Sequence, residues 1–264
     1  MIPKKLHLCW LSGDEFPPLI EYCVNTWKKV LPEYEIVVWD KQKFNLDSHP
    51  WVKSAFAKKK YAFAADYIRF YALYTEGGIY LDSDVEVIRS FDSLLSNKAF
   101  IGFEASTGDL EAAVVGAEKG MEWCKNVLDF YANRVFDTDS NGGVDPSLFA
   151  PQVLRRVLND SGIIVPDSAV HEIVEDTKSQ IMFYPSTSFS PIEYDKEKSY
   201  NESNSISLKY YSNPQTYCIH RFNASWGIKP SKKVQLIDYA KKKLIKLFGK
   251  AKADCIIQIL RKFL

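Results

Sequence analysis

The 264-residue sequence contains no apolar run approaching the ~20 residues that an α-helix needs to cross a lipid bilayer. No apolar stretch follows the basic residues near its N-terminus, so no signal peptide is visible. Both absences argue against a secreted protein and against one with a membrane-spanning helix. We therefore expect a cytoplasmic protein.

Cysteine is scarce and shows no functional spacing. The five cysteines are scattered, odd in number and without a C-x-x-C pair: Cys9, Cys23, Cys124, Cys218 and Cys255. A disulfide framework would need paired cysteines at regular spacings in a short secreted chain. We expect reduced thiols, most of them buried.

The net charge is also small, +1, but it is unevenly distributed. Residues 229–264 hold eleven Lys or Arg against two Asp, which gives +9, so residues 1–228 carry −8. Such an asymmetry indicates a surface partner for the basic end. No known nucleic-acid-binding module is present, so we do not expect nucleic acid to be that partner.

What is present is an ordinary globular composition, with 46% hydrophobic and 25% charged residues. The length suits one α/β domain with a small appendage, and we place the domain at 1–228 and the tail at 229–264. Aromatic residues make up 14% of the chain. Most of these rings are expected to fill the core, although aromatic rings also stack on bases and sugars.

The order of the expected elements favours a parallel arrangement at the start of the sheet. A strand at 5–11, a helix at 18–30 and a strand at 34–39 form a βαβ unit. A long helix at 62–76 is stopped by two glycines and followed by a strand at 79–81. Further strands are expected at 85–88, 99–104, 112–117 and 216–220, helices at 120–134 and 147–159, and loop with short strands at 185–214.

Asp82-Ser83-Asp84 stands directly after the strand at 79–81, where open α/β sheets bind ligands. Two carboxylates at i and i+2 on a turn can both face one hard cation. Such a cation stabilises the charge that develops when a diphosphate leaves an activated sugar. The alternative is a simple acidic turn.

The chain matches two unrelated acidic motifs poorly. In haloacid dehalogenase-like phosphatases Thr or Val stands two residues after the second Asp, whereas this chain has Glu86. A second D-x-D, in Asp137-Thr-Asp139-Ser-Asn141-Gly142, copies the start of a calcium loop. That loop needs Glu at its twelfth position, where Leu148 stands, so we interpret it as a solvated loop.

Four segments in order resemble glycosyltransferase family 32, which includes capsular-polysaccharide transferases and yeast mannosyltransferases. They are Ile2-Pro-Lys-Lys-Leu-His-Leu-Cys-Trp-Leu-Ser-Gly13, Ala62-Phe-Ala-Ala-Asp-Tyr-Ile-Arg69, Gly77-Gly-Ile-Tyr-Leu-Asp-Ser-Asp84, and Ile219-His220 through Ser225-Trp226. The resemblance covers about residues 2–228 and extends in its core to the large clostridial glucosylating toxins. It implies a Rossmann-like GT-A fold with a mixed central sheet, a divalent metal (Mn²⁺ or Mg²⁺) and retaining transfer from a nucleotide sugar.

The resemblance also implies roles for individual residues. Trp10 would stack on the donor's base, and Asp66 and Arg69, which share a helix face at i and i+3, would grip the sugar or phosphate. Tyr80 would touch the donor or belong to the core. The implied metal ligands are Asp82, Asp84 and His220, with Asn223 or Ser225 as helpers, and Trp226 would close over the diphosphate. Glu104 is our candidate for a catalytic carboxylate near the site.

We therefore predict transfer of a hexose from a UDP-sugar, such as UDP-galactose or UDP-glucose, to a glycan or lipid-linked saccharide in bacterial surface (capsule) polysaccharide synthesis. The acceptor stays open, because Asp145-Pro146 replaces the Gly-Pro usual in the family. The alternatives are a non-catalytic protein that binds sugar nucleotides or glycans, and a toxin-like transferase that modifies a protein.

The basic tail shows two amphipathic helical patterns, at about 231–248 and 252–263. Apolar stripes beside Lys-rich faces fit helices that lie in an anionic membrane surface, here the inner face of the cell membrane. The alternative is a pair of helices packed on the core with a solvated basic face.

Overall fold

The computed structural model describes residues 1–105, 107–167, 172–192 and 208–222. Several predictions fall outside these described residues. They concern the metal helpers Asn223 and Ser225, the ring of Trp226, and the tail at 229–264 with its helices at 231–248 and 252–263. The boundary between domain and tail therefore stays a prediction.

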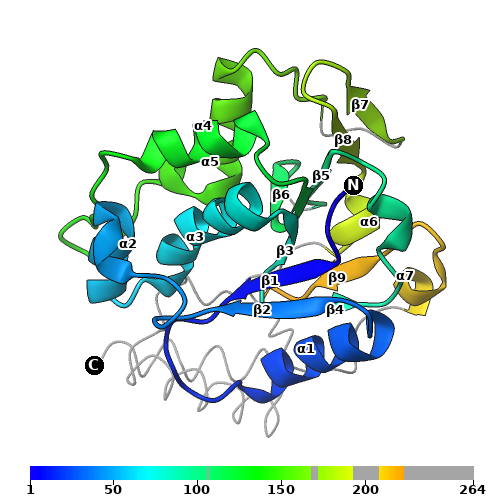
Figure 1. The fold of residues 1–264 in the computed structure, drawn as a ribbon, viewed down its shortest axis with the longest axis horizontal. Coiled ribbons are helices and arrows are strands. Elements are labelled where there is room, and N and C mark those ends of the chain that lie inside the picture. The colour runs from blue at the N-terminus through cyan, green and yellow to red at the C-terminus, as the bar shows by residue number, and fades with distance from the viewer. Residues whose placement is uncertain (106, 168–171, 193–207, 223–264) are drawn as a thin grey trace, which may run out of the picture. The chain divides into compact units, whose positions relative to one another are not determined.

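A mixed sheet of seven strands forms the centre of the described part (Figure 1). Its order is β2-β1-β3-β6-β5-β8-β7, with bounds β1 Lys5–Cys9, β2 Glu35–Trp39, β3 Gly78–Leu81, β5 Ala99–Phe103, β6 Leu110–Ala117, β7 Val174–Asp176 and β8 Ile181–Tyr184. β1 is parallel to both β2 and β3, β5 is parallel to β8, and the remaining pairs are antiparallel. The predicted α/β class with a mixed central sheet is confirmed.

Helices cover both faces of this sheet. The described helices are α1 Pro18–Val30, α2 Pro50–Ala57, α3 Tyr61–Glu76, α4 Glu122–Tyr131, α5 Ala150–Asp160, α6 Ser186–Phe189 and α7 Leu208–Ser212. Three 3₁₀ turns lie at Leu46–Ser48, Asp92–Leu94 and Pro146–Leu148. Figure 1 shows α3, α4 and α5 on one side of the sheet and α1 on the other.

The core accordingly forms two clusters. One contains residues of α2 to α5, and the other contains the α1 residues Ile20, Val24 and Trp27. Strand alternation divides the side chains between them, since Tyr80 of β3 joins the first cluster while its neighbours Ile79 and Leu81 join the second. The cysteines among the described residues are free thiols, and all but the partly exposed Cys9 are buried.

Two glycines make the turn from α3 into β3. Gly77 and Gly78 have φ of 68° and 118°, values that residues with a Cβ rarely adopt. A Cβ on Gly77 would lie 2.6 Å from the backbone nitrogen of Lys119, and one on Gly78 would lie 2.8 Å from the carbonyl oxygen of Lys5. This close approach sets β3 beside β1, and it brings Asp82 to the carboxyl edge of the sheet.

A second, two-stranded sheet joins distant parts of the chain. β4, Val85–Val87, pairs antiparallel with β9, Cys218–His220, and Val85 lies opposite His220. The backbone N–H of Arg221 donates to the carbonyl of Asp84 over 3.0 Å. The ladder therefore holds His220 next to the second residue of the acidic pair.

Several predicted elements need correction. The helix α2 and the strands β7 and β8 were not predicted. The segments of α2 and β8 are short and rich in apolar residues, which does not distinguish strand from helix, and β7 is a polar three-residue strand at the sheet edge. The stretch 185–214, expected to be loop with short strands, contains helices α6 and α7. The predicted helix at 147–159 begins as a 3₁₀ turn, and its α-helical part starts only at Ala150, with Pro151 in its first turn.

Candidate functional site

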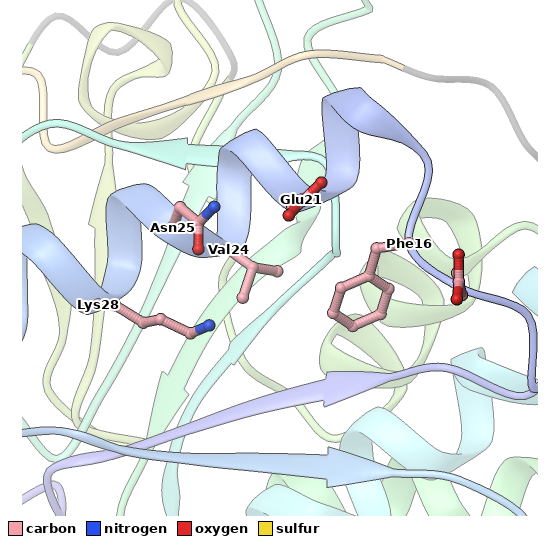
Figure 2. Close-up of a pocket in the computed structure, with 6 residues that line it drawn as sticks. Phe16, Glu21, Val24, Asn25 and Lys28 are labelled. Carbon is pink, nitrogen blue, oxygen red and sulfur yellow. The ribbon is translucent and has the colours of Figure 1, made fainter.

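Two cavities of about 320 Å³ each lie in the described part of the chain. Figure 2 shows one of them, lined by Phe16 and by α1 side chains that include Val24 and Lys28. It contains none of the candidate metal ligands. The other cavity contains the acidic groups, and convergent polar groups in a concave space are the usual mark of a ligand site.

This second cavity lies at the carboxyl end of β3, between α3, β6 and α5. Its polar side includes Asp66, Arg69, Asp82, Glu104, Asp109, Glu111 and His220. Its apolar side comes mainly from the first turns of α3 and α5 and includes Phe63, Phe149 and Pro151. A polar floor opposite an apolar wall suits a ligand that carries both charge and an apolar face.

Asp82 is held from three directions. Its backbone N–H donates to the carbonyl of Ala113 over 2.9 Å, which extends the β3–β6 ladder past the end of β3. The Tyr80 hydroxyl donates to Oδ1 over 2.9 Å, and Nη2 of Arg69 donates to the same oxygen over 3.3 Å. Asp82 keeps a side-chain exposure of 31%, so its carboxylate still faces the cavity.

Arg69 is a buried cation at the centre of this arrangement. Its guanidinium forms an ion pair of 3.1 Å with Asp66, donates to the carbonyl of Ala112, and lies 4.6 Å from the centre of the Tyr80 ring. Burial raises the pKa of Asp66 to about 7; the charge of Arg69 opposes this shift and that of Asp82 adds to it. The i,i+3 pair predicted on one helix face therefore exists, and both members line the cavity.

His220 lies between two carboxylates. Its Nε2 is 3.6 Å from Oδ1 of Asp84, and its Nδ1 is 3.4 Å from Oε2 of Glu111. Burial opposes protonation of the ring, but Glu111 and Asp84 outweigh it and raise the pKa of His220 to about 10. The two carboxylates give the His220 ring strongly negative surroundings, which also attract a metal cation.

The candidate metal ligands do come together. Asp82, Asp84 and His220 each offer one ligand atom within 4.8 Å of the others. Two carboxylates and an imidazole form a donor set that fits Mn²⁺, which accepts both oxygen and nitrogen ligands. The structure thus brings together Asp82 and Asp84, which form the D-x-D motif, and His220, which only the family resemblance indicated.

Glu104 also lies in this cavity, as expected for a carboxylate near the site. Thr107 donates to its Oε2 over 2.9 Å. Burial and the neighbouring Glu111 raise the pKa of Glu104 to about 7. A carboxyl group with such a pKa can hold or release a proton near neutrality.

Sequence reasoning missed Glu111. This residue is 1% exposed and lies in β6, an otherwise apolar strand. A single charge within the run Leu110–Ala117 was the available signal, because a buried carboxylate needs a partner. Its partners come from β9 and from its own strand, so only the folded chain identifies them.

Two aromatic residues predicted to contact the donor, Tyr80 and Trp10, lie outside the cavity's lining. Tyr80 is buried, and its hydroxyl reaches Asp82, so it supports that carboxylate and does not line the cavity. Trp10 is partly exposed and lies outside the cavity's lining. Its indole N–H donates to the carbonyl of Asp14 over 2.7 Å, and Phe16 packs edge-on against its ring.

The other acidic motif, at Asp137 and Asp139, is occupied by contacts with its own loop and with one lysine. Oδ1 of Asp139 accepts from the N–H groups of Asn141 and Gly143, and Asp137 pairs with Lys58. Its carboxylates thus stabilise an exposed turn, in agreement with the predicted solvated loop.

Residues 17–101, which contain Asp66, Arg69, Asp82 and Asp84, match the family described as "glycosyltransferase sugar-binding region containing DXD motif". This match spans less than half of the chain. The resemblance expected from the sequence is confirmed.

The chain is also similar to curated fungal proteins. It is 33% identical over 134 residues to inositol phosphoceramide mannosyltransferase 3 of Schizosaccharomyces pombe, a match that covers 48% of this chain and 36% of that protein. It is 31% identical over 108 residues to mannosyl phosphorylinositol ceramide synthase SUR1 of Saccharomyces cerevisiae, covering 38% and 27%. The chain thus spans about a third of the length of the curated relatives it matches.

Solved structures with some similarity are glycosyltransferases as well. PaToxG glycosyltransferase matches with 22% identity and a TM-score of 0.47, covering 61% of this chain and 69% of that one. A glycosyltransferase involved in glycosylation of the PBCV-1 major capsid matches with 13% identity and a TM-score of 0.43, covering 85% and 97%. Within the described residues, no helix has the length and apolar character required to cross a membrane.

Proposed function

We propose that this chain is a metal-dependent glycosyltransferase of the GT-A type that transfers a hexose from a nucleotide sugar with retention of configuration. The observation that carries this proposal is the cluster of Asp82, Asp84 and His220, because Asp82 and His220 line one cavity together with the buried Asp66–Arg69 pair. The two Asp residues and the ion pair all lie in the segment that matches the glycosyltransferase region.

Asp82, Asp84 and His220 are the residues that would hold the cation, with Asn223 and Ser225 proposed as further ligands. When bound, Mn²⁺ or Mg²⁺ supplies a Lewis acid for the negative charge of the departing diphosphate. The protein's part is to fix the ligand positions before the donor arrives. The contacts of Asp82 with Ala113, Arg69 and Tyr80 serve this purpose.

Arg69 and Asp66 would orient the donor sugar. The guanidinium is buried, and its Nε has no hydrogen-bond partner among the described residues, so it retains an unused donor. The Asp66 carboxyl can accept or donate a hydrogen bond to a sugar hydroxyl, because its pKa lies at about 7. Trp10 would stack on the base, and Trp226 would close over the diphosphate.

Retention requires the acceptor hydroxyl to attack the anomeric carbon from the face that the diphosphate leaves. We propose Glu104 as the catalytic carboxylate near the attacking hydroxyl. Its raised pKa suits a group that takes or holds a proton near neutral pH.

Mannose is the sugar that the relatives' names favour, and a lipid bearing inositol phosphate is the acceptor that they name. We therefore add GDP-mannose to UDP-glucose and UDP-galactose as proposed donors. A hydroxyl on a lipid-linked acceptor is the proposed target, and the apolar wall with Phe63, Phe149 and Pro151 supports an acceptor with an apolar part. The names of the relatives do not support the predicted capsule context.

A membrane-attached acceptor gives the basic tail a purpose. We propose that residues 231–263 bind an anionic membrane surface from the cytoplasm, so that the cavity reaches the acceptor. The +9 charge of residues 229–264 supports attraction to anionic lipid.

Hydrolysis and transfer assays across a donor panel test the proposal. We expect one nucleotide sugar to be hydrolysed in the presence of Mn²⁺, and excess chelator to abolish this hydrolysis. The same donor should then label a phosphoinositol lipid or a saccharide acceptor. Full activity in excess chelator would refute the metal-dependent mechanism, and tight donor binding without turnover would favour a non-catalytic binding protein.

A further inference from the structure

Glu111 occupies an irregular point in the sheet. β5 and β6 pair regularly as far as Ile101 opposite Val115, and the next pair is Gly102 opposite Glu111, so β6 has extra residues between the two pairs. Such irregularities bend a strand and redirect its side chains, and they are frequent beside active sites. Here the irregularity lies immediately next to the cavity.

The extra residues of β6 contact the site directly. The carbonyl of Ala112 accepts from Arg69, and the carbonyl of Ala113 accepts from the backbone N–H of Asp82 over 2.9 Å. The position of this segment therefore determines where Asp82 lies. Whatever holds the segment in its irregular shape also holds the first candidate metal ligand.

Glu111 connects this segment to His220. Its Oε1 accepts from the N–H of Ala113 over 2.7 Å, and its Oε2 lies 3.4 Å from Nδ1 of His220. The carboxylate is 1% exposed, so both contacts are shielded from water. Glu111 thus contacts the β6 segment that holds Asp82 with one oxygen and the ring of His220 with the other.

We propose that Glu111 is a positioning residue that sets both Asp82 and His220 for cation binding. A carboxylate that accepts Nδ1–H of a histidine leaves the lone pair of Nε2 free and fixes the ring plane. Nε2 is the atom of His220 that faces Asp84, at 3.6 Å from its Oδ1. This inference deepens the proposed function and depends on the site's binding a divalent cation.

Glu111→Gln separates this role from simple packing, because it preserves the shape of the side chain. The amide has only one acceptor oxygen. If that oxygen keeps the Ala113 N–H, the NH₂ group faces Nδ1 of His220, so the tautomer with the proton on Nε2 is favoured and its lone pair is lost. Loss of such a carboxylate partner costs about 10–100-fold in metal affinity.

The measurement is Mn²⁺ binding in the presence of UDP or GDP, followed by electron paramagnetic resonance. A pulsed experiment on the same samples detects the ¹⁴N nucleus of a bound imidazole. For the wild type we expect saturable binding with a ¹⁴N signal. For Glu111→Gln we expect about 10–100-fold weaker binding and a diminished ¹⁴N signal, with the thermal midpoint of unfolding showing that the protein is folded.

Glu35→Gln is the matched control, since it makes the same change at a carboxylate of β2 that lies outside the cavity and has a side-chain exposure of 64%. Its Mn²⁺ affinity should stay within a few-fold of the wild type. If Glu111→Gln matches Glu35→Gln in affinity and keeps the ¹⁴N signal, the assignment of Glu111 is wrong while the proposed function stands. If the wild type binds no Mn²⁺ with either nucleotide, the assignment of Glu111 and the proposed function are both wrong.

If Glu111→Gln does not fold, it is replaced by Glu111→Asp, whose side chain is too short to reach both partners. Unchanged affinity in that variant likewise overturns the assignment.

Discussion

At the scale of single residues, the cavity depends on a few charges held in fixed positions. Arg69 contacts Asp66, Asp82 and the carbonyl of Ala112 at once, and each contact uses its planar fork. His220 lines the same cavity, and its Nε2 lies 3.6 Å from Oδ1 of Asp84. Substitutions that keep size and change one atom therefore separate chemistry from folding.

The first prediction concerns Asp84→Asn. The amide keeps the shape but loses the charge that a divalent cation needs, so we expect Mn²⁺-dependent donor hydrolysis to fall at least about 100-fold. Steady-state hydrolysis and a thermal unfolding curve measure the two effects, and the midpoint should move by only a few degrees.

Asp139→Asn is its control, because it alters the other D-x-D motif. The Asp139 side chain accepts hydrogen bonds from its own loop, which an Asn oxygen can also accept. This variant should hydrolyse donor at the wild-type rate. Equal activities for Asp84→Asn and Asp139→Asn would show that Asp84 is not required.

The second prediction concerns Arg69→Lys. Lysine keeps the charge, but its ammonium cannot make the same bidentate contacts, so the sugar and Asp82 should lose their alignment. Because misplacement of about 1 Å can cost 100-fold in rate, we expect kcat to fall by about that factor. Nucleotide affinity, measured by calorimetry, should change much less.

Arg156→Lys is the control for this prediction. Arg156 lies on α5 with a side-chain exposure of 61%. If Arg69→Lys turns over donor as fast as Arg156→Lys, the role assigned to the guanidinium fork is wrong.

At the scale of elements, a buried ion pair joins β4 to the segment after β9. Glu86 and Arg221 are each 2% exposed and are 3.0 Å apart. The hydroxyls of Tyr22 and Tyr211 also donate to Glu86, so α1 and α7 meet the same carboxylate. Because Glu86 stands two residues after Asp84 and Arg221 directly follows His220, the pair stabilises the ladder that brings the two candidate ligands together.

The third prediction follows from this pair. Removing one partner of a buried ion pair leaves an unpaired charge and costs about 3–5 kcal/mol. We expect Glu86→Gln and Arg221→Met each to lower the free energy of unfolding in urea by this amount. Donor hydrolysis should also fall, because the β4–β9 ladder is weakened.

A double-mutant cycle supplies the control. The double variant, Glu86→Gln with Arg221→Met, leaves no unpaired charge and should cost clearly less than the sum of the single variants. Strict additivity, or single variants within about 0.5 kcal/mol of the wild type, would show that the pair does not stabilise the ladder.

At the scale of the whole molecule, charge divides the chain into an acidic part and a basic end. Residues 1–228 carry −8 and residues 229–264 carry +9. The candidate site among the described residues lies entirely in the acidic part. The two parts can therefore be tested separately.

The fourth prediction is that removing residues 230–264 abolishes binding to anionic liposomes. Each Lys or Arg near an anionic surface contributes about 1 kcal/mol, so several together give salt-sensitive attachment. Donor hydrolysis in solution should largely survive, because the proposed donor site ends at Trp226, whereas transfer to a lipid-linked acceptor should fall. Liposome sedimentation at low and high salt measures the binding.

Two outcomes would contradict the membrane role. A truncated protein that is insoluble or unfolded would show that the apolar stripes of the tail pack on the core. A full-length protein that ignores anionic liposomes even at low salt would show that the basic face is only solvated surface.

Local features of this fold were predictable from the sequence because their causes are local. Helix α1 was predicted at its observed bounds, since its apolar period and its proline start lie within the segment itself. The double glycine, the strand β3 and the acidic pair after it were predicted for the same reason. These features place Asp82 and Asp84 at a strand end, and the α3 period places Asp66 and Arg69 on one face.

Contacts between distant segments were decided only by the tertiary structure. The pairing of β4 with β9 brings His220 to Asp84, and the irregular pairing of β5 with β6 turns Glu111 toward His220. No local period encodes either pairing, because strand order and register depend on how all the strands and helices pack together. By itself the sequence thus determined which residues carry the acidic chemistry, whereas the sheet decided which buried charges face them, since burial and partner choice are properties of the packed chain.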